Sequence, residues 1–202
     1  RYEKQIRQVN VEGTRNVCEA AVKAGVKKLI HFSSVDAFYR FPIEEPLLES
    51  RSLIDDPNAV PYDLSKADGQ KIVLEFCEKD LDASIIHPTS IVGPNDFKPG
   101  LPMQEMVNLA NGKRKLLPNW GYNFVDVRDL CITAISAVKL GRTGQNYIVG
   151  GEYHLYSYIA ELMKQQLGRT VLLTTIPNFV TYLGLPYEYI KSLITGKPRV
   201  LT

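Results

Sequence analysis

The stretch Lys28-Leu29-Ile30-His31-Phe32-Ser33 decides the fold, because it is a short apolar run that ends in a hydroxyl. Apolar residues that follow one another without alternation are typical of a strand that is buried on both faces. Residues 83–88 repeat this pattern, and apolar residues at helical spacing precede each run, over residues 6–24 and 64–79. The order helix, strand, helix, strand predicts the α/β class with a parallel sheet.

The ends of both predicted strands are polar. Ser33 and Ser34 close the first strand, and Thr89 and Ser90 follow Pro88 at the end of the second. In parallel α/β sheets, ligands bind beyond the carboxyl ends of the strands. We therefore expect these side chains to border one crevice.

The rest of the chain is less regular. Residues 40–61 contain four prolines, which forbid a long helix or strand and predict a loop of unusual length. Loops of this length in compact domains are usually functional or mobile. Beyond residue 94 we expect helices over 103–111, 129–140, 155–167 and 179–194 and strands over 115–117, 145–149 and 171–175.

Composition excludes several classes of partner. The 202 residues carry a net charge of +2, and the basic residues are scattered, so neither nucleic acid nor an anionic membrane surface is expected to bind. No apolar run reaches the ~18 residues that span a bilayer. Cys18, Cys77 and Cys131 lack the spacing of a zinc site or a disulfide framework, so we expect buried thiols, no metal and a reducing cytoplasm.

The segment Tyr62-Asp63-Leu64-Ser65-Lys66 carries the chemistry. Residues four apart lie on one face of a helix, so the lysine ammonium can act on the tyrosine hydroxyl. A nearby cation favours the phenolate, and proton transfer is most efficient when the pKa of the group approaches the operating pH. The spacing makes Tyr62 a candidate general acid or base, with a surface pair as the ordinary alternative.

Several segments together resemble one family, the extended short-chain dehydrogenase/reductases, also described as the NAD-dependent epimerase/dehydratase family. Residues 33–38 and 86–96 are most similar to its dihydroflavonol-reductase-like branch, whereas many sugar-nucleotide members carry an arginine where His87 stands. The segments that carry the family resemblance, in order, are residues 10–21, 31–35, 62–66, 87–94 and 122–129.

The resemblance implies an incomplete Rossmann-type, doubly wound parallel sheet with a smaller C-terminal substrate-binding region. Family members open with a glycine-rich turn that receives the cofactor pyrophosphate, and no such cluster stands here. We therefore expect the chain to be a piece of a longer protein. Residues 1–94 would form the C-terminal part of the dinucleotide-binding domain. Residues 95–202 would mainly bind substrate, with elements at about 122–150 returning to pack on the Rossmann sheet.

The resemblance also implies the roles of the site residues. Tyr62 would donate or remove the proton, Lys66 would lower the pKa of Tyr62 and hydrogen-bond the nicotinamide ribose, and Ser34 would hold the substrate oxygen. Ser33 is the alternative serine, because the alignment allows a shift of one residue. The remaining cofactor contacts would come from Ser33, Pro88, Thr89 and Val92.

Other polar and aromatic residues have more than one interpretation. Asn10 stands inside a predicted helix and would either anchor a buried polar network or face solvent. His31 and His87 lie in buried strands and are more often satisfied core histidines than ligands. Phe97, Trp120 and Tyr122 would either line an aromatic substrate pocket or serve ordinary packing.

The resemblance implies an NAD- or NADP-dependent oxidoreductase that acts on a ketone, an aldehyde or a secondary alcohol of a small molecule. The first alternative is a nucleotide-sugar epimerase or dehydratase that uses bound NAD. The second is a non-catalytic dinucleotide-sensing protein on the same fold, since a fold alone does not fix function. Family members often pair through the helices at 6–24 and 63–79, so a homodimer is expected.

Overall fold

The computed structural model describes residues 2–113, 116–118, 120–168 and 174–176. The helix expected at 179–194 and most of the strand expected at 171–175 lie outside these residues. The chain forms two compact units. The first contains Arg1–Thr89 and Arg128–Val149, and the second contains Ser90–Val127 and Gly150–Thr202. Each unit is described by itself.

The first unit is built on a parallel sheet. Its described strands are β1 (Leu29–Phe32), β2 (Ala83–Pro88) and β6 (Asn146–Val149), in the order β1-β2-β6. Leu29 pairs with Ala83, and Ile85 pairs with Asn146. All of β2 is buried, as expected for a central strand with helices on both faces. The predicted α/β class and parallel sheet are confirmed.

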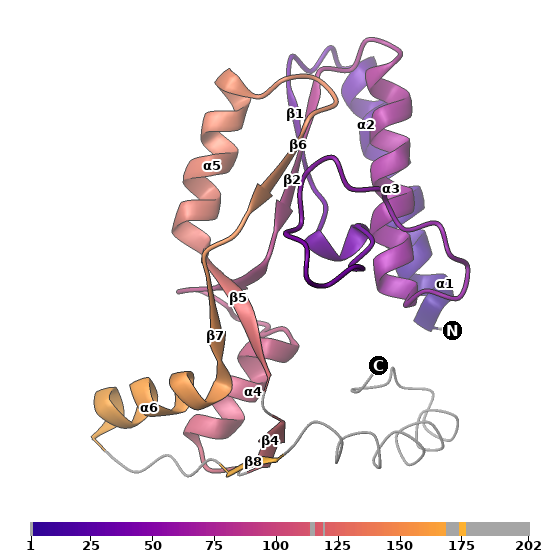
Figure 1. The fold of residues 1–202 in the computed structure, drawn as a ribbon. Coiled ribbons are helices and arrows are strands. Elements are labelled where there is room, and N and C mark those ends of the chain that lie inside the picture. Colours follow the sequence, from indigo (N-terminus) through magenta and orange to yellow (C-terminus); the bar gives the residue numbers. More distant parts are fainter. Residues whose placement is uncertain (1, 114–115, 119, 169–173, 177–202) are drawn as a thin grey trace. The chain divides into compact units, whose positions relative to one another are not determined.

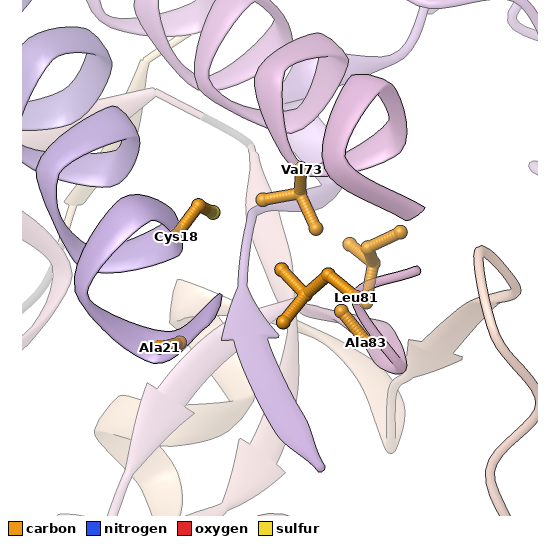
Figure 2. Close-up of a cluster of buried hydrophobic side chains, with 6 residues drawn as sticks. Cys18, Ala21, Val73, Leu81 and Ala83 are labelled. Atoms are coloured by element: carbon orange, nitrogen blue, oxygen red, sulfur yellow. The ribbon is translucent and has the colours of Figure 1, made fainter. Parts of the chain in front are cut away.

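Helices cover both faces of this sheet. Figure 1 shows α2 (Gly13–Lys23) and α3 (Pro61–Cys77) on one face and α5 (Val127–Leu140) on the other. Pro61 begins α3 at a position where a missing N–H costs nothing. The core between α2, α3 and the sheet appears in Figure 2, and its buried members are Cys18, Ala21, Val73, Leu81, Ala83 and Ile85.

The N-terminal helix is not continuous. The helix expected over residues 6–24 is α1 (Tyr2–Arg7), a π-helical segment (Gln8–Glu12) and α2. A π turn holds one residue more than an α turn and is frequent at functional sites. Beside it, a Cβ on Gly69 of α3 would lie 2.5 Å from the Asn10 carbonyl oxygen. Glycine at position 69 therefore permits the close approach of the two helices.

The long loop between β1 and α3 is tied to the sheet. A 3-10 turn (Val35–Ala37) opens it, and a bridge pairs Phe38 with Leu53. The Glu49 carboxylate accepts a hydrogen bond of 3.1 Å from the backbone N–H of Ile148 in β6. The loop also surrounds an open hollow of about 670 Å³, lined by Tyr39, Phe41, Glu45, Pro46, Leu48, Ser50, Arg51 and Ser52.

The second unit joins a small sheet to two helices. Met106 of α4 and Tyr156 of α6 are the buried centre of its core, against which Val92 and Phe124 pack. The pattern of the sequence predicted the helices, but β3, β5 and β7 were not foreseen. The described elements are β3 (Ser90–Val92), α4 (Leu101–Ala110), β4 (Leu116–Pro118), β5 (Gly121–Asp126), β7 (Glu152–Leu155), α6 (Tyr156–Leu167) and β8 (Thr174–Ile176).

Candidate active site

Ser34 stands where β1 turns into the 3-10 segment. Its backbone is extended, and its hydroxyl oxygen accepts a hydrogen bond of 3.2 Å from the Asp36 N–H, which caps the turn. The same hydroxyl lies 3.2 Å from Oδ2 of Asp36, to which it donates. The carboxylate therefore holds the Ser34 proton, and a substrate oxygen must compete with it.

Ser33 has a different environment. Both serines are buried, but the Ser33 hydroxyl donates to Oε1 of Gln70 in α3 over 3.0 Å. Its N–H donates to the carbonyl oxygen of Ile86, which continues the pairing of β1 with β2. Ser33 is thus held between the sheet and α3, whereas the Ser34 hydroxyl belongs to the loop beyond the strand.

Tyr62 and Lys66 share one face in the first turns of α3. The Lys66 ammonium lies 5.9 Å from the centroid of the Tyr62 ring. Tyr62 is 37% exposed, so its phenol is not sealed within the core. The Lys66 Nζ also donates to the Phe32 carbonyl oxygen over 3.2 Å, which ties the lysine to the carboxyl end of β1. The predicted Tyr-Lys pair and the strand that carries the serines therefore meet.

Burial changes the electrostatics around Lys66. Desolvation lowers the pKa of the Lys66 ammonium below its ordinary value. His31 lies nearby in β1, and burial, the Lys66 charge and His87 together lower the pKa of His31 to about 4. His31 is therefore neutral near pH 7, and its imidazole places no positive charge beside Lys66.

Asn10 anchors the start of α3 from the π turn. Its Nδ2 donates to the Ser65 hydroxyl over 3.0 Å, and that hydroxyl donates to the Tyr62 carbonyl oxygen over 2.7 Å. Of its two interpretations, the polar network is the one found. The chain of bonds runs from the N-terminal helix to the backbone of the candidate catalytic tyrosine.

A second chain of charges links the serine turn to the tyrosine turn. Arg40 bonds Asp36 over 3.0 Å and Asp63 over 2.8 Å. Asp63 is buried, and burial raises the pKa of its carboxyl to about 6, against the lowering effect of Arg40. Arg40 therefore joins the carboxylate that holds Ser34 to the residue that follows Tyr62.

The residues expected to contact a nicotinamide fall in both units. Pro88 ends β2 in the first unit and is buried. Thr89 follows it, and its buried hydroxyl has no hydrogen-bond partner among the residues that the structure describes. Such an orphaned group fits a bound ligand with polar atoms. Val92 lies in β3 of the second unit and packs against the core of that unit.

The aromatic residues of the second unit have separate positions. Tyr122 in β5 contacts the rings of Phe124 and Tyr156, with centroids 6.0 Å and 5.9 Å apart. Phe97 is 90% exposed, and Trp120 is 36% exposed. Ring packing therefore accounts for one side of Tyr122, and the pocket expected from these residues stays a prediction.

Several polar residues near the site were missed. Asp36, Arg40, Glu49, Gln70 and Asn146 take part in its hydrogen bonds. A signal for Gln70 was present, because it stands four residues after Lys66 and so on the same helix face. Asp36 and Arg40 are also close in sequence, since Asp36 stands two residues after Ser34 and four before Arg40. The contacts of Glu49 and Asn146 join distant segments, which no local spacing reveals. Among the described helices, none is both long and apolar enough to cross a bilayer.

Comparison with curated proteins gives relatives of several activities. The chain is 29% identical over 160 residues to "Sterol demethylase protein B" of Methylococcus capsulatus, covering 79% of this chain and 48% of that protein. It is 29% identical over 159 residues to a protein of Synechocystis sp. named "Putative dihydroflavonol 4-reductase", covering 71% of this chain and 43% of that protein. The chain thus spans about half the length of the curated relatives it matches.

Solved structures share the fold. The crystal structure of gox2253 matches with a TM-score of 0.84 and 29% identity, covering 99% of this chain and 61% of that one. A dTDP-glucose 4,6-dehydratase from Bacillus anthracis in complex with NAD matches with a TM-score of 0.72 and 22% identity, over 85% and 56%. The model of the NAD dependent epimerase/dehydratase family matches residues 1–150. With the sheet and the Tyr-Lys helix as described, this match confirms the expected family, and the chain belongs to the NAD dependent epimerase/dehydratase family.

Proposed function

We propose that this chain is the catalytic part of an NAD(P)-dependent oxidoreductase that acts on a small molecule through Ser34, Tyr62 and Lys66. One observation carries the proposal. Lys66 lies beside the exposed Tyr62 ring and also bonds the backbone at the end of the strand that leads to Ser34. A proton donor, a cation and a hydroxyl are thus supplied by adjoining segments, as reduction of a carbonyl requires.

Each side chain has a distinct task in this proposal. Tyr62 gives its phenolic proton to the substrate oxygen in reduction and removes it in oxidation. Lys66 favours the phenolate of Tyr62 through its charge, and its remaining N–H groups are available to a ribose hydroxyl. Ser34 exchanges its bond to Asp36 for a bond to the substrate oxygen.

The cofactor supplies and accepts the hydride when it is bound. The residues that would hold it are Ser33, Tyr62, Lys66, Pro88, Thr89 and Val92. The orphaned Thr89 hydroxyl supports this assignment from the first unit. Both NAD and NADP are included in the proposal, and a homodimer is proposed on the family pattern alone.

Replacing Tyr62 by phenylalanine tests the proposal. In the full-length protein, we expect Tyr62→Phe to lower kcat by about 10²- to 10⁴-fold, the usual contribution of general acid-base catalysis. The affinity for NAD(P), measured by calorimetry, should change little. Tyr147→Phe is the matched control, because the Tyr147 hydroxyl accepts a bond from the Arg142 N–H and serves the fold elsewhere. Equal turnover in Tyr62→Phe and the wild type would remove Tyr62 from the mechanism.

A second function uses the same residues. The relatives include a dTDP-glucose 4,6-dehydratase of Streptomyces antibioticus, 28% identical over 153 residues, which favours a nucleotide-sugar epimerase or dehydratase. Such an enzyme regenerates its bound NAD within each turnover. Absorbance at 340 nm therefore separates the two proposals, since an oxidoreductase consumes one cofactor for each product molecule and an epimerase or dehydratase consumes none. A dinucleotide sensor would bind cofactor without any turnover.

A further inference from the structure

A buried polar network lies between the sheet and α3, and His87 is at its centre. His87 is fully buried in β2. Its Nδ1 lies 3.0 Å from the Ser34 carbonyl oxygen, and its Nε2 lies 3.1 Å from Oδ1 of Asn146 in β6. The Phe38 ring packs against the imidazole with centroids 4.5 Å apart. The imidazole therefore bridges the candidate catalytic turn and the neighbouring strand.

The orientation of the network follows from groups that can only accept hydrogen bonds. Asn146 Nδ2 donates to the Glu49 carbonyl oxygen over 3.1 Å, which directs Oδ1 of Asn146 toward His87. Gln70 Nε2 donates to the same Oδ1 over 2.8 Å, and Oε1 of Gln70 accepts from Ser33. His87 thus faces two oxygen acceptors, one at each ring nitrogen.

Only one of the two ring nitrogens of a neutral His87 can donate a hydrogen bond. Burial lowers the pKa of His87, although its bonds to Ser34 and Asn146 and the Glu49 charge act in the opposite direction. A neutral imidazole carries one N–H, so it donates either to Ser34 through Nδ1 or to Asn146 through Nε2. Each of the two oxygens already accepts one other bond, Oδ1 of Asn146 from Gln70 over 2.8 Å and the Ser34 carbonyl from the Ala37 N–H over 3.1 Å. What favours donation from Nδ1 is the shorter contact of 3.0 Å, and that a backbone carbonyl can only accept, whereas a side-chain amide can turn to present either its oxygen or its nitrogen.

We propose that His87 is a positioning residue that holds the Ser34 turn in place by donating from Nδ1 to the Ser34 carbonyl oxygen. The carbonyl and the hydroxyl belong to the same residue, and this residue opens the turn that the hydroxyl caps. A fixed carbonyl limits the directions in which the hydroxyl can point toward a substrate oxygen. The inference rests on the proposed function, since it gives Ser34 a substrate contact. His87 touches neither substrate nor cofactor in this role.

Two substitutions separate the two ring nitrogens. The amide nitrogen of asparagine occupies nearly the place of Nδ1, and that of glutamine nearly the place of Nε2. We expect His87→Asn to keep kcat within about threefold of the wild type and His87→Gln to lower it about tenfold, the usual worth of one such hydrogen bond. The affinity for NAD(P) should be unchanged in both. Equal losses in the two variants, or a glutamine variant as active as the wild type, would overturn the proposal.

A spectroscopic test does not depend on turnover. The chain has 3 histidines, so ¹H–¹⁵N correlation spectra of the imidazole rings are simple, and the signals that His87→Gln removes belong to His87. We expect a proton on Nδ1 of His87 at the pH of the assay. An unprotonated Nδ1 would refute the bond to Ser34, whatever the turnover of the variants. Absence of any NAD(P)-dependent turnover in the wild type would instead refute the proposed function and leave this measurement valid.

Discussion

Gly69 is a position where a single methyl group should disturb the packing of two helices. A Cβ there would lie 2.5 Å from the Asn10 carbonyl oxygen and 3.5 Å from the Thr14 hydroxyl oxygen. The two helix backbones would have to separate by about 0.5 Å merely to reach 3.0 Å, a distance that real Cβ atoms still avoid. Overpacking of this kind costs about 1–3 kcal/mol. Alanine regains up to about 1 kcal/mol of helix propensity.

We therefore expect Gly69→Ala to lower the free energy of unfolding by about 1–2 kcal/mol, since the overpacking exceeds the gain in propensity. Urea denaturation followed by circular dichroism measures it. Gly13→Ala is the matched control, because Gly13 also lies in a helix of this pair and its Cβ would meet only the Gln8 carbonyl oxygen at 3.8 Å. The control should be neutral or more stable. A Gly69→Ala protein as stable as Gly13→Ala would refute the close-approach argument.

Two further predictions concern charge. The carboxyl of Asp63 has its pKa raised from 3.8 to about 6, so the folded protein holds a proton that the unfolded chain releases, and stability falls as pH rises through this window. The free energy of unfolding of Asp63→Asn, measured by urea titration, should therefore rise relative to that of the wild type between pH 4 and pH 7, by as much as about 3 kcal/mol. A difference between the two proteins that does not change with pH would contradict this. Lys28 donates to Asp82 and to the Gly141 carbonyl oxygen, each over 2.7 Å. Lys28→Met should cost about 1–2 kcal/mol at pH 7. Hydrogen bonds from Lys28 and Thr143 lower the pKa of Asp82, so this cost should shrink as pH falls through the pKa of Asp82, and a cost that is constant down to pH 3 would count against the pair.

The elements that carry a strong local signal were predictable. The short, mainly apolar run of β2 and the spacing of Ala67, Ile72 and Val73 in α3 predict a strand and a helix without help from distant residues. Pro61 was assigned to the loop over residues 40–61 and the helix was expected from residue 64, whereas α3 begins at Pro61, a favoured first helical position for proline. These segments also contain Tyr62 and Lys66, so the candidate site could be read from the sequence together with the fold.

The elements that were missed depend on distant partners. β5 and β7 pair with each other over a separation of about thirty residues, and Gly121 in β5 is needed because a Cβ would collide with the His154 backbone. The same holds for the network around His87, whose members come from the long loop, α3, β2 and β6. Hydrogen bonds between such distant segments leave no periodic trace in a single sequence.

The π turn at Gln8–Glu12 determines how the chain should respond to the loss of a residue. Each residue turns an α-helix by about 100°, and the extra residue of a π turn shifts everything before it by that angle. Deleting one residue within this turn would produce a regular helix and carry Arg7 away from its ion pair with Asp68, which spans 2.8 Å. A single-residue deletion would therefore preserve helicity while changing which side chains of residues 3–7 face α3.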